Sequence, residues 1–437
     1  MSTAATGSAT AAEPGTKRRQ AWTATWLLLG FMLVNFADKA VLGLAAKPIM
    51  HDLHLTRAEF GAASTAFFAL FSLSALLVSF LLRKVSSAVL LLIMALVWSA
   101  AQLPLAANLG FGALVGTRLL LGAAEGPAAP VAVHHLFGWF GHRDRQLPLA
   151  ILNAGAVAGI VVAGPVLTAV IKNFGWHAAF AAVGAVGLVW ALVWLKLGKE
   201  GPDSGRAESQ PDLGDTALGE SPAVPYRRIL LSGTWLAAAF TAFAVYWHLA
   251  SFLTWTADYL QTVAGLSTTQ SGYAISGEAA MAGLLVVGFG VGAGRLQRAG
   301  RTRTITSVAV TGLLVSAVAT AAFGAIGSAV VKVALLVLLM PAAGVGIVQA
   351  EAAVGRIAPA ARRGVSLGVL TFVFSLAGGL SPAVVGAMVD ASATPAAGYR
   401  NAYLISAALL MVAAAVALRW LRPERDAERL AVDGPTP

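Results

Sequence analysis

The sequence contains no cysteine, which excludes disulfide bonds, zinc–thiolate sites and iron–sulfur clusters. Charge is also scarce: Asp, Glu, Lys and Arg make up 11% of the 437 residues, against roughly 25% in an ordinary soluble domain. The seven histidines show no metal-binding spacing, so we expect no metal site. Hydrophobic residues make up 58%, and a soluble fold cannot hide that much apolar surface because it always exposes a large part of its atoms. The composition therefore predicts a polytopic membrane protein.

The sequence contains many long apolar segments. They reach about 20 residues, the length of helix that spans a hydrocarbon core about 30 Å thick. We predict an all-α protein whose twelve transmembrane helices cover residues 22–44, 59–82, 86–107, 111–139, 147–171, 177–197, 229–259, 271–293, 303–326, 329–355, 362–390 and 399–421. Pro127 and Pro130 fall inside the fourth helix, where neighbouring helices can restore the lost backbone hydrogen bonds.

A polar segment divides these helices into two halves. Residues 198–228 are rich in Gly, Pro, Ser, Asp and Glu, which is the composition of a linker rather than of a folded domain. The basic loop 290–303 has a shorter counterpart after the second helix, and repeated halves around a central site are common in transporters. The expected organisation is a cytoplasmic tail over 1–21, six-helix halves over 22–197 and 229–421 joined by a cytoplasmic linker over 198–228, and a cytoplasmic tail over 422–437.

The net charge of +10 is explained by membrane topology. Lys and Arg accumulate in the short cytoplasmic loops of membrane proteins. With both termini inside, 23 of the 30 Lys and Arg fall in cytoplasmic segments and five in outer ones, which leaves Lys39 and Arg118 within the bilayer. This bias predicts a multi-pass protein of the inner or plasma membrane with both termini in the cytoplasm. The lipid bilayer is then its expected partner, and no nucleic acid is needed to explain the charge.

The first helix carries three polar residues on one face. Asn35, Asp38 and Lys39 are spaced i, i+3 and i+4. A charge at a helix centre costs on the order of 2.5–3.5 kcal/mol, so such residues are usually functional. Asp38 can exchange a proton and Lys39 can hold an anion. The alternative is a structural ion pair, which direct pairing between neighbours pointing about 100° apart does not favour.

The fourth helix carries Arg118 and Glu125, two turns apart and on nearly one face. Glu125 precedes Gly126-Pro127, which loosens the helix beside it. We expect Glu125 to couple transport to protons, and the alternative is a latch to a neighbouring helix. For Arg118 a structural role and a substrate-binding role are equally open.

Two further acids are secondary candidates. Glu278 lies in the eighth predicted helix and Glu351 near the cytoplasmic end of the tenth. Intramembrane acids are functional by default. Glu278 can serve as a second proton site or as a partner for a cation, whereas Glu351 can simply be solvated.

The seventh helix carries a group of aromatic residues. Trp and Tyr near the ends of membrane helices are usually anchors at the membrane interface, and we expect this role for Trp255 and Tyr259. Tyr246 and Trp247 lie mid-helix and either line a cavity or pack in the core.

Several motifs occur in a specific order. They are Asn35-Phe-Ala-Asp38-Lys39, Arg118-x-x-x-Gly122-x-x-Glu125-Gly-Pro-x-x-Pro130, Trp139-Phe140 with Arg145, Gly175-Trp176-His-Ala-Ala-Phe180, Trp255-x-x-x-Tyr259-Leu260, and Arg363-Gly364 through Gly378, Pro382 and Gly386. Over about residues 22–421 this order resembles the anion:cation symporter branch of the major facilitator superfamily, which includes sugar-acid permeases and relatives of sialin. The resemblance implies the major facilitator fold.

The resemblance also implies roles for individual residues. Asp38 and Glu125 match acids used for proton coupling. Lys39 matches a basic residue, more often Arg, that holds the substrate carboxylate, and Arg118 matches an Arg that supports the same region. Tyr246 matches an aromatic residue near the substrate.

Three positions depart from the family pattern. Lys39 replaces a forked donor by a point charge, which relaxes the geometry of carboxylate binding. Ser375 stands where Asn is common, and Ala156 stands where sugar-acid members often have Gln. Fewer amides in the cavity make a heavily hydroxylated sugar acid a weaker expectation and leave open a smaller, or a more apolar or aromatic, carboxylate.

Together these features predict a secondary transporter that takes up a small organic anion, such as a carboxylate or sugar acid, with protons by alternating access. No cofactor is expected beyond the coupling ion, sodium is an alternative to the proton, and the protein is expected to be a monomer. One rival is a proton-coupled exporter of apolar or cationic compounds, which the positive charge of Lys39 disfavours. A second is an anion sensor, for which the tails and the linker offer no output domain. No nucleophile–base or metal spacing stands out, so we expect no enzyme.

Overall fold

The computed structural model describes residues 14–82, 84–107, 110–141, 144–202 and 224–432, and all regular secondary structure in these residues is helical. The first half of the chain forms α1 (Pro14–Leu44), α2 (Ala46–Asp52), α3 (Arg57–Leu81), α4 (Ser87–Ala106), α5 (Gly110–Glu125), α6 (Ala128–Phe137) and α7 (Gln146–Leu197). The second half forms α8 (Tyr226–Leu230), α9 (Gly233–Thr262), α10 (Thr268–Arg298), α11 (Thr302–Ala325), α12 (Ala329–Leu338), the 3₁₀ turn η1 (Met340–Ala343), α13 (Gly344–Ile357), α14 (Ala360–Asp390), α15 (Pro395–Trp420) and α16 (Pro423–Val432).

The described helices make twelve membrane passes, as predicted. Ten segments are long and apolar enough to cross a membrane by length and composition, and α12, η1 and α13 form one of them. Another, α7, is 52 residues long and turns at Gly175, so it makes two passes. The φ of Gly175 is +83°, a conformation that favours glycine. The remaining pass is α5 with α6, which are separated at Gly126-Pro127.

The chain ends differ in detail from the prediction. Helix α1 begins at Pro14 rather than at residue 22, and the segment expected as a C-terminal tail contains α16. Most of the expected linker, residues 203–223, lies outside the described residues, as do 1–13 and 433–437.

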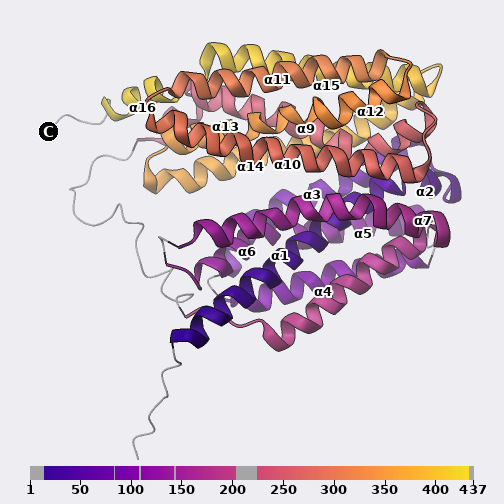
Figure 1. The fold of residues 1–437 in the computed structure, drawn as a ribbon, viewed down its shortest axis with the longest axis horizontal. Helices are drawn as coiled ribbons and strands as arrows, with labels where there is room; N and C mark the ends of the chain where they lie inside the picture. The colour runs from indigo at the N-terminus through magenta and orange to yellow at the C-terminus, as the bar shows by residue number, and fades with distance from the viewer. Residues whose placement is uncertain (1–13, 83, 108–109, 142–143, 203–223, 433–437) are drawn as a thin grey trace, which may run out of the picture.

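The two halves lie side by side, with α1–α7 in one and α8–α16 in the other, and the described chain begins and ends at the same end of the bundle (Figure 1). We call this the terminus end. The halves meet along α1 and α9, α3 and α14, and α7 and α10. Glycines allow backbone contact at these seams: a Cβ on Gly43 would lie 1.8 Å from the carbonyl oxygen of Leu253, and one on Gly61 2.4 Å from that of Pro382. Small residues bring membrane helices together in this way.

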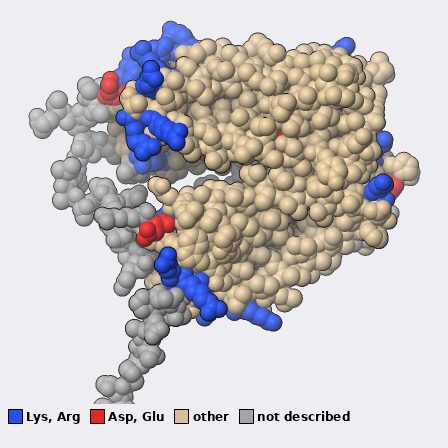
Figure 2. All heavy atoms as spheres, in the orientation of Figure 1, with Lys and Arg blue, Asp and Glu red and all other residues tan. Residues whose placement is uncertain are grey.

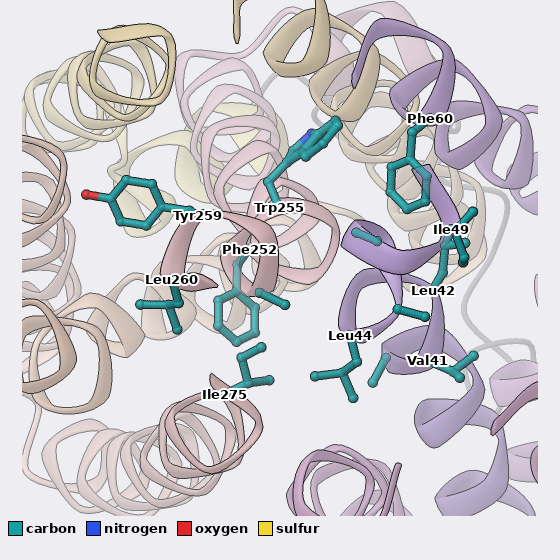
Figure 3. Close-up of a cluster of buried hydrophobic side chains, with 14 of the residues drawn as sticks. Val41, Leu42, Leu44, Ile49, Phe60, Phe252, Trp255, Tyr259, Leu260 and Ile275 are labelled. Atoms are coloured by element: carbon teal, nitrogen blue, oxygen red, sulfur yellow. The ribbon is translucent and has the colours of Figure 1, made fainter. Parts of the chain in front are cut away.

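The end away from the termini is closed by a buried apolar cluster from both halves. Figure 3 shows Phe60 of α3 beside Trp255 of α9, and Val41 and Leu44 of α1 belong to the same buried cluster. The rings of Phe60 and Trp255 meet edge to face, with centroids 5.6 Å apart. Edge-to-face packing is a preferred arrangement of aromatic rings. We call this the closed end.

Two residues in this cluster overturn the prediction of interfacial anchors. Trp255 and Tyr259 are 1% and 0% exposed. Trp255 donates a hydrogen bond from Nε1 to the carbonyl oxygen of Pro382, 3.0 Å away, and the Tyr259 hydroxyl donates to that of Phe323 at 2.7 Å. Their polar atoms are therefore satisfied inside the protein rather than at the membrane surface, because α14 and α11 supply the accepting carbonyl groups.

The terminus end is open and basic. Figure 2 shows Lys and Arg gathered at this end and a hollow between the two halves that faces it. The structure is therefore closed at one end and accessible at the other, which is one of the two states that an alternating-access protein visits.

Candidate functional site

A cavity of about 150 Å³ lies between the halves where α1, α3, α5, α6 and α9 meet. Its polar lining from α1 and α5 consists of Asn35 and four charged residues, Asp38, Lys39, Arg118 and Glu125. Its aromatic lining comes from α1, α3 and α9 and consists of Phe36, Phe67, Phe68, Phe71 and Tyr246. The cavity thus places most of the intramembrane charge of the first half beside a group of aromatic rings.

Lys39 forms an ion pair with Glu125. Its Nζ lies 3.1 Å from Oε2 of Glu125, and the two side chains are 15% and 1% exposed. The same ammonium donates a hydrogen bond to Oδ1 of Asn35, one turn earlier on α1. The ion pair therefore connects α1 to α5, and Lys39 does not pair with its chain neighbour Asp38. In a buried pair, removal of one partner leaves the other charge uncompensated.

A carboxamide from α4 connects Asp38 to Arg118. Gln102 donates a hydrogen bond to Oδ1 of Asp38, and its Oε1 accepts one from Nη2 of Arg118 at 3.4 Å. All three side chains are buried. A carboxamide carries both a donor and an acceptor, so one side chain can hold the carboxylate and the guanidinium together.

Only some of the polar atoms in this lining have hydrogen-bond partners. Four buried atoms have no hydrogen-bond partner among the described residues: Asn35 Nδ2, Asp38 Oδ2, Arg118 Nε and Glu125 Oε2. Glu125 Oε2 meets Lys39 at ion-pair distance but without the alignment of a hydrogen bond. Because nearly all buried polar atoms in proteins have partners, this group of four makes the cavity a candidate site for a ligand or a proton.

A second ion pair joins the two halves at the closed end. Arg57 of α3 donates from Nε to Oδ2 of Asp258 on α9 at 2.9 Å, and Asp258 is 1% exposed. The Tyr399 hydroxyl of α15 donates to the same oxygen, and Thr262 donates to the other carboxylate oxygen at 3.0 Å. The Asp258 carboxylate therefore has partners on both oxygens and from both halves.

The family model described as Major Facilitator Superfamily matches residues 27–382. The chain belongs to this superfamily. It is 28% identical over 399 residues to a hexuronate transporter of Bacillus subtilis (strain 168), covering 90% of this chain and 92% of the relative. It is 27% identical over 295 residues to a D-galactonate transporter of Escherichia coli, covering 64% of this chain and 68% of the relative. These similarities confirm the predicted resemblance to the sugar-acid permeases of the major facilitator superfamily.

Solved structures of superfamily members share the fold. A bacterial homologue of the human lysosomal transporter Spinster, in an inward-facing and occupied conformation, superposes with a TM-score of 0.77 at 19% identity, covering 95% of this chain and 98% of that one. The D-xylose-proton symporter superposes with a TM-score of 0.75 at 15% identity, covering 93% and 99%. As a major facilitator protein, the chain is a multi-pass membrane transporter and not an enzyme, as predicted.

The structure brings most of the predicted site residues of this major facilitator protein together. Those that line the cavity are Asn35, Asp38, Lys39, Arg118, Glu125 and Tyr246. Trp247 and Ser375 are buried but do not line it, and Trp247 Nε1 and Ser375 Oγ have no hydrogen-bond partner among the described residues. The proposed role of each residue stays a prediction.

The two secondary acids lie apart from the cavity. Glu278 is buried in α10, at 8% exposure, and is not part of the cavity lining. Glu351 is exposed on α13. Neither therefore faces the ion pair of Lys39 directly.

Sequence reasoning missed three features of the site. Gln102 is the only carboxamide in the apolar helix α4, and that isolation was the available signal. Phe67, Phe68 and Phe71 looked like ordinary apolar residues of a membrane helix, and nothing in their spacing marks a cavity wall. Asp258 was overlooked although it is an acid within a predicted span, the same signal that selected Asp38.

Proposed function

We propose that this transporter takes up a small organic anion together with protons. The observation that carries the proposal is the Lys39–Glu125 ion pair in the cavity between the halves. Lys39 offers a positive charge that an anion can bind, and its current partner is a group that can be neutralised by a proton. Relatives named for hexuronate and D-galactonate, both carboxylates, support an organic acid as the cargo.

The coupling follows from competition for one ammonium group. A substrate carboxylate and the Glu125 carboxylate both bind Lys39. When Glu125 takes up a proton, its negative charge disappears and Lys39 is free to hold the substrate. Asp38, next to Lys39 in the chain and held by Gln102, provides a second proton position in the same lining.

The balance of charge in the cavity also favours binding of the anion together with a proton. The lining holds two acids, Asp38 and Glu125, and two bases, Lys39 and Arg118, so its formal charges cancel. An anion entering alone would leave one unbalanced negative charge inside the protein, which is costly at low dielectric. An anion entering with one proton leaves the cavity neutral and allows it to close.

Alternating access requires the closed end to open. The Arg57–Asp258 ion pair crosses between the halves there, so it must separate before the cavity can face the other side. We propose that the halves over 22–197 and 229–421, joined by the linker over 198–228, rock about the cavity. Since one chain supplies the whole cavity lining, the monomer is the proposed working unit.

The distribution of Lys and Arg gives the proposed orientation. Basic residues gather at the terminus end (Figure 2), and basic loops favour the cytoplasmic side. We therefore propose that both termini lie in the cytoplasm and that the protein resides in the inner or plasma membrane.

Proton-coupled uptake can be tested with purified protein in liposomes that contain a trapped pH dye. Sugar acids, small hydroxy acids and aromatic acids are added outside, with lipophilic cations as the comparison. Symport acidifies the interior faster than in protein-free liposomes, and Lys39→Ala liposomes behave like protein-free ones. Replacing sodium by potassium leaves the rate unchanged if the proton is the coupling ion.

Other results would overturn the proposal. Alkalinisation upon addition of the cations indicates exchange and makes the protein an exporter. Anion movement that depends on sodium and leaves the internal pH unchanged removes the proton from the mechanism. No response to any acid above the protein-free rate rejects anion symport altogether.

A further inference from the structure

The cavity wall beyond the charged residues is made of aromatic rings. Phe67 and Phe68 meet edge to face with centroids 5.1 Å apart, and Phe71 lies 5.4 Å from Phe67. Across the boundary between the halves, Phe68 meets Tyr246 edge to face at 6.1 Å. These rings line one continuous surface on α3 and α9. A planar aromatic cargo can pack against such a surface with the same edge-to-face geometry.

Lys39 places its charge next to this surface. Its Nζ lies 4.4 Å from the centroid of the Phe36 ring and 5.7 Å from that of Phe71. A carboxylate bound to Lys39 therefore holds whatever is attached to it against phenyl rings. The arrangement suits an anion whose carboxylate is joined directly, or through a short link, to an apolar ring.

Besides its charged residues, the described lining has four polar side chains that can bind hydroxyls: Asn35, Ser64, Thr254 and Tyr246. Its only carboxamide among the described residues is Asn35, whose Oδ1 already accepts from Lys39. Ser64 donates its hydroxyl to the carbonyl oxygen of Phe60 at 3.1 Å. A sugar acid carries a hydroxyl on most of its carbons, and each one left without a partner in a closed cavity weakens binding.

The size of the cavity agrees with a single ring. Its volume is about 150 Å³, and an apolar cavity of roughly 150 Å³ is known to hold benzene. The charged residues line the same cavity, so a carboxylate on the ring lies beside groups that can neutralise it.

We propose that the cargo is an aromatic monocarboxylate of about the size of benzoate, and that Phe36, Phe67, Phe68 and Phe71 select it over polyhydroxylated acids. This inference rests on the proposed anion transport and names its substrate class. The carboxylate binds Lys39 while the ring packs on the phenyl groups of α1 and α3.

The test is calorimetric titration of the purified protein with benzoate, cyclohexanecarboxylate, glucuronate and galactonate. Benzoate is expected to bind at least about tenfold more tightly than either sugar acid, because several hydroxyls stay unpaired. Phe71→Leu should weaken benzoate about three- to tenfold, the worth of one aromatic contact, and should weaken glucuronate less than benzoate. Phe68→Leu provides the same test if Phe71→Leu does not fold. Phe372→Leu is the matched control, since Phe372 is 55% exposed on α14 and outside the cavity.

The outcomes separate this inference from the proposed function. Sugar acids that bind as tightly as benzoate, or a Phe71→Leu variant with unchanged benzoate affinity, overturn the aromatic class. If sugar acids also acidify the liposomes while the aromatic acids match the protein-free rate, anion symport stands and only the substrate class fails. If no acid binds and none moves, both proposals fail together.

Discussion

Two buried ion pairs in this transporter differ in where they lie and in how completely they are satisfied. Lys39 and Glu125 belong to the same half, on α1 and α5, and face the cavity. Arg57 and Asp258 belong to different halves, on α3 and α9, and lie in the closed end. The first pair can change its charge without moving the halves, whereas the second cannot separate unless they move.

The two ion pairs also differ in how many hydrogen bonds their carboxylates receive. At the closed end, Asp258 receives hydrogen bonds on both oxygens, and next to the pair the backbone amide of Ala58 donates to Oδ2 of Asp390 at 2.7 Å. In the cavity, Asp38 and Glu125 each keep a carboxylate oxygen without a hydrogen bond. Complete satisfaction is what a structural contact needs, and unsatisfied buried atoms are expected where a ligand or a proton binds. The comparison therefore supports the proposal that the cavity pair binds ligands and that the other pair holds the closed end shut.

The largest expected effect comes from removing the cation of the cavity pair. Lys39→Ala should lower the initial rate of anion uptake in liposomes about 100-fold or more, because the anion loses its charged partner, and loss of one partner of a buried, hydrogen-bonded charge pair costs binding about 2–5 kcal/mol. Lys39→Arg keeps the positive charge and should retain measurable uptake. Uptake by Lys39→Ala at the wild-type rate, with correctly folded protein in the membrane, would show that the anion binds elsewhere.

The next effect separates coupling from binding. Glu125→Gln removes the group that we propose to exchange the proton, but it leaves Lys39 free to bind the anion. A pH gradient should then no longer drive accumulation above about onefold, while exchange of labelled for unlabelled anion continues, because only the linkage between the two ligands is lost. Asp38→Asn is the parallel variant in the same lining. If both variants still accumulate the anion in response to a pH gradient, the coupling residues have been wrongly assigned.

A smaller effect is expected at the closed end, where Arg57→Ala should shift the protein toward the state open on the other side. The chain has no native cysteine, so Ala129→Cys places a single thiol in the cavity lining. An impermeant maleimide applied to intact cells should label it about tenfold faster when Arg57 is also replaced, since a modest free-energy change moves a two-state equilibrium that far.

Two controls test whether the Arg57–Asp258 ion pair itself sets the labelling rate: one swaps the two charges, and the other breaks an ion pair elsewhere. Exchanging the two groups, as Arg57→Asp with Asp258→Arg, should restore slow labelling if the ion pair itself holds the end closed. Arg356→Ala breaks an exposed pair with Glu424, 2.7 Å long, and should leave labelling unchanged. Equal labelling rates with and without Arg57 would mean that the apolar cluster alone keeps this end closed.

The same comparison shows what sequence alone can reveal. Twelve passes and the shared face of Asn35, Asp38 and Lys39 follow from helical periodicity and from the cost of charge in a membrane, and the structure confirms them. The partner of Lys39 did not follow, because it lies on another helix: spacing placed Glu125 on the same face as Arg118 but gave no contact to Lys39. Helical periodicity and hydropathy identify the charged residues that are costly to bury in a membrane. Which of these residues contact each other depends on how the helices pack.

The prediction from sequence was also wrong for the burial of two aromatic residues, because their burial depends on how the helices pack. Trp255 and Tyr259 near a predicted helix end looked like interface anchors, yet α9 continues to Thr262 and other helices cover both rings. Asp258 lies between them in the sequence and is buried with them. A residue's depth in a bundle depends on how far its neighbours extend, which hydropathy along one chain does not report.

Another buried carboxylate, outside both ion pairs, gives the smallest expected effect and serves as a reference for the carboxylates of the two pairs. Asp426 of α16, 4% exposed, accepts from the backbone amide and the hydroxyl of Thr234 at 2.9 and 2.7 Å, at the start of α9. Burial alone would raise the pKa of Asp426, but hydrogen bonds from Thr234 and Arg425 outweigh it and hold the pKa below its ordinary value. A carboxylate with a lowered pKa stabilises the fold above the pKa of the unfolded chain, and this contribution disappears as the pH falls through the folded-state pKa.

Asp426→Asn should therefore lower the free energy of unfolding by about 1 kcal/mol at pH 7, the usual worth of a helix cap, and leave transport intact. Thermal unfolding of the detergent-purified protein at a series of pH values measures it, and the difference between variant and wild type should shrink toward acid pH. Glu424→Gln, two residues away and exposed, is the matched control and should change little. A loss of proton-driven uptake in Asp426→Asn would contradict the distinction between the carboxylates, because a fully satisfied group outside the cavity and the closed end should contribute to stability alone.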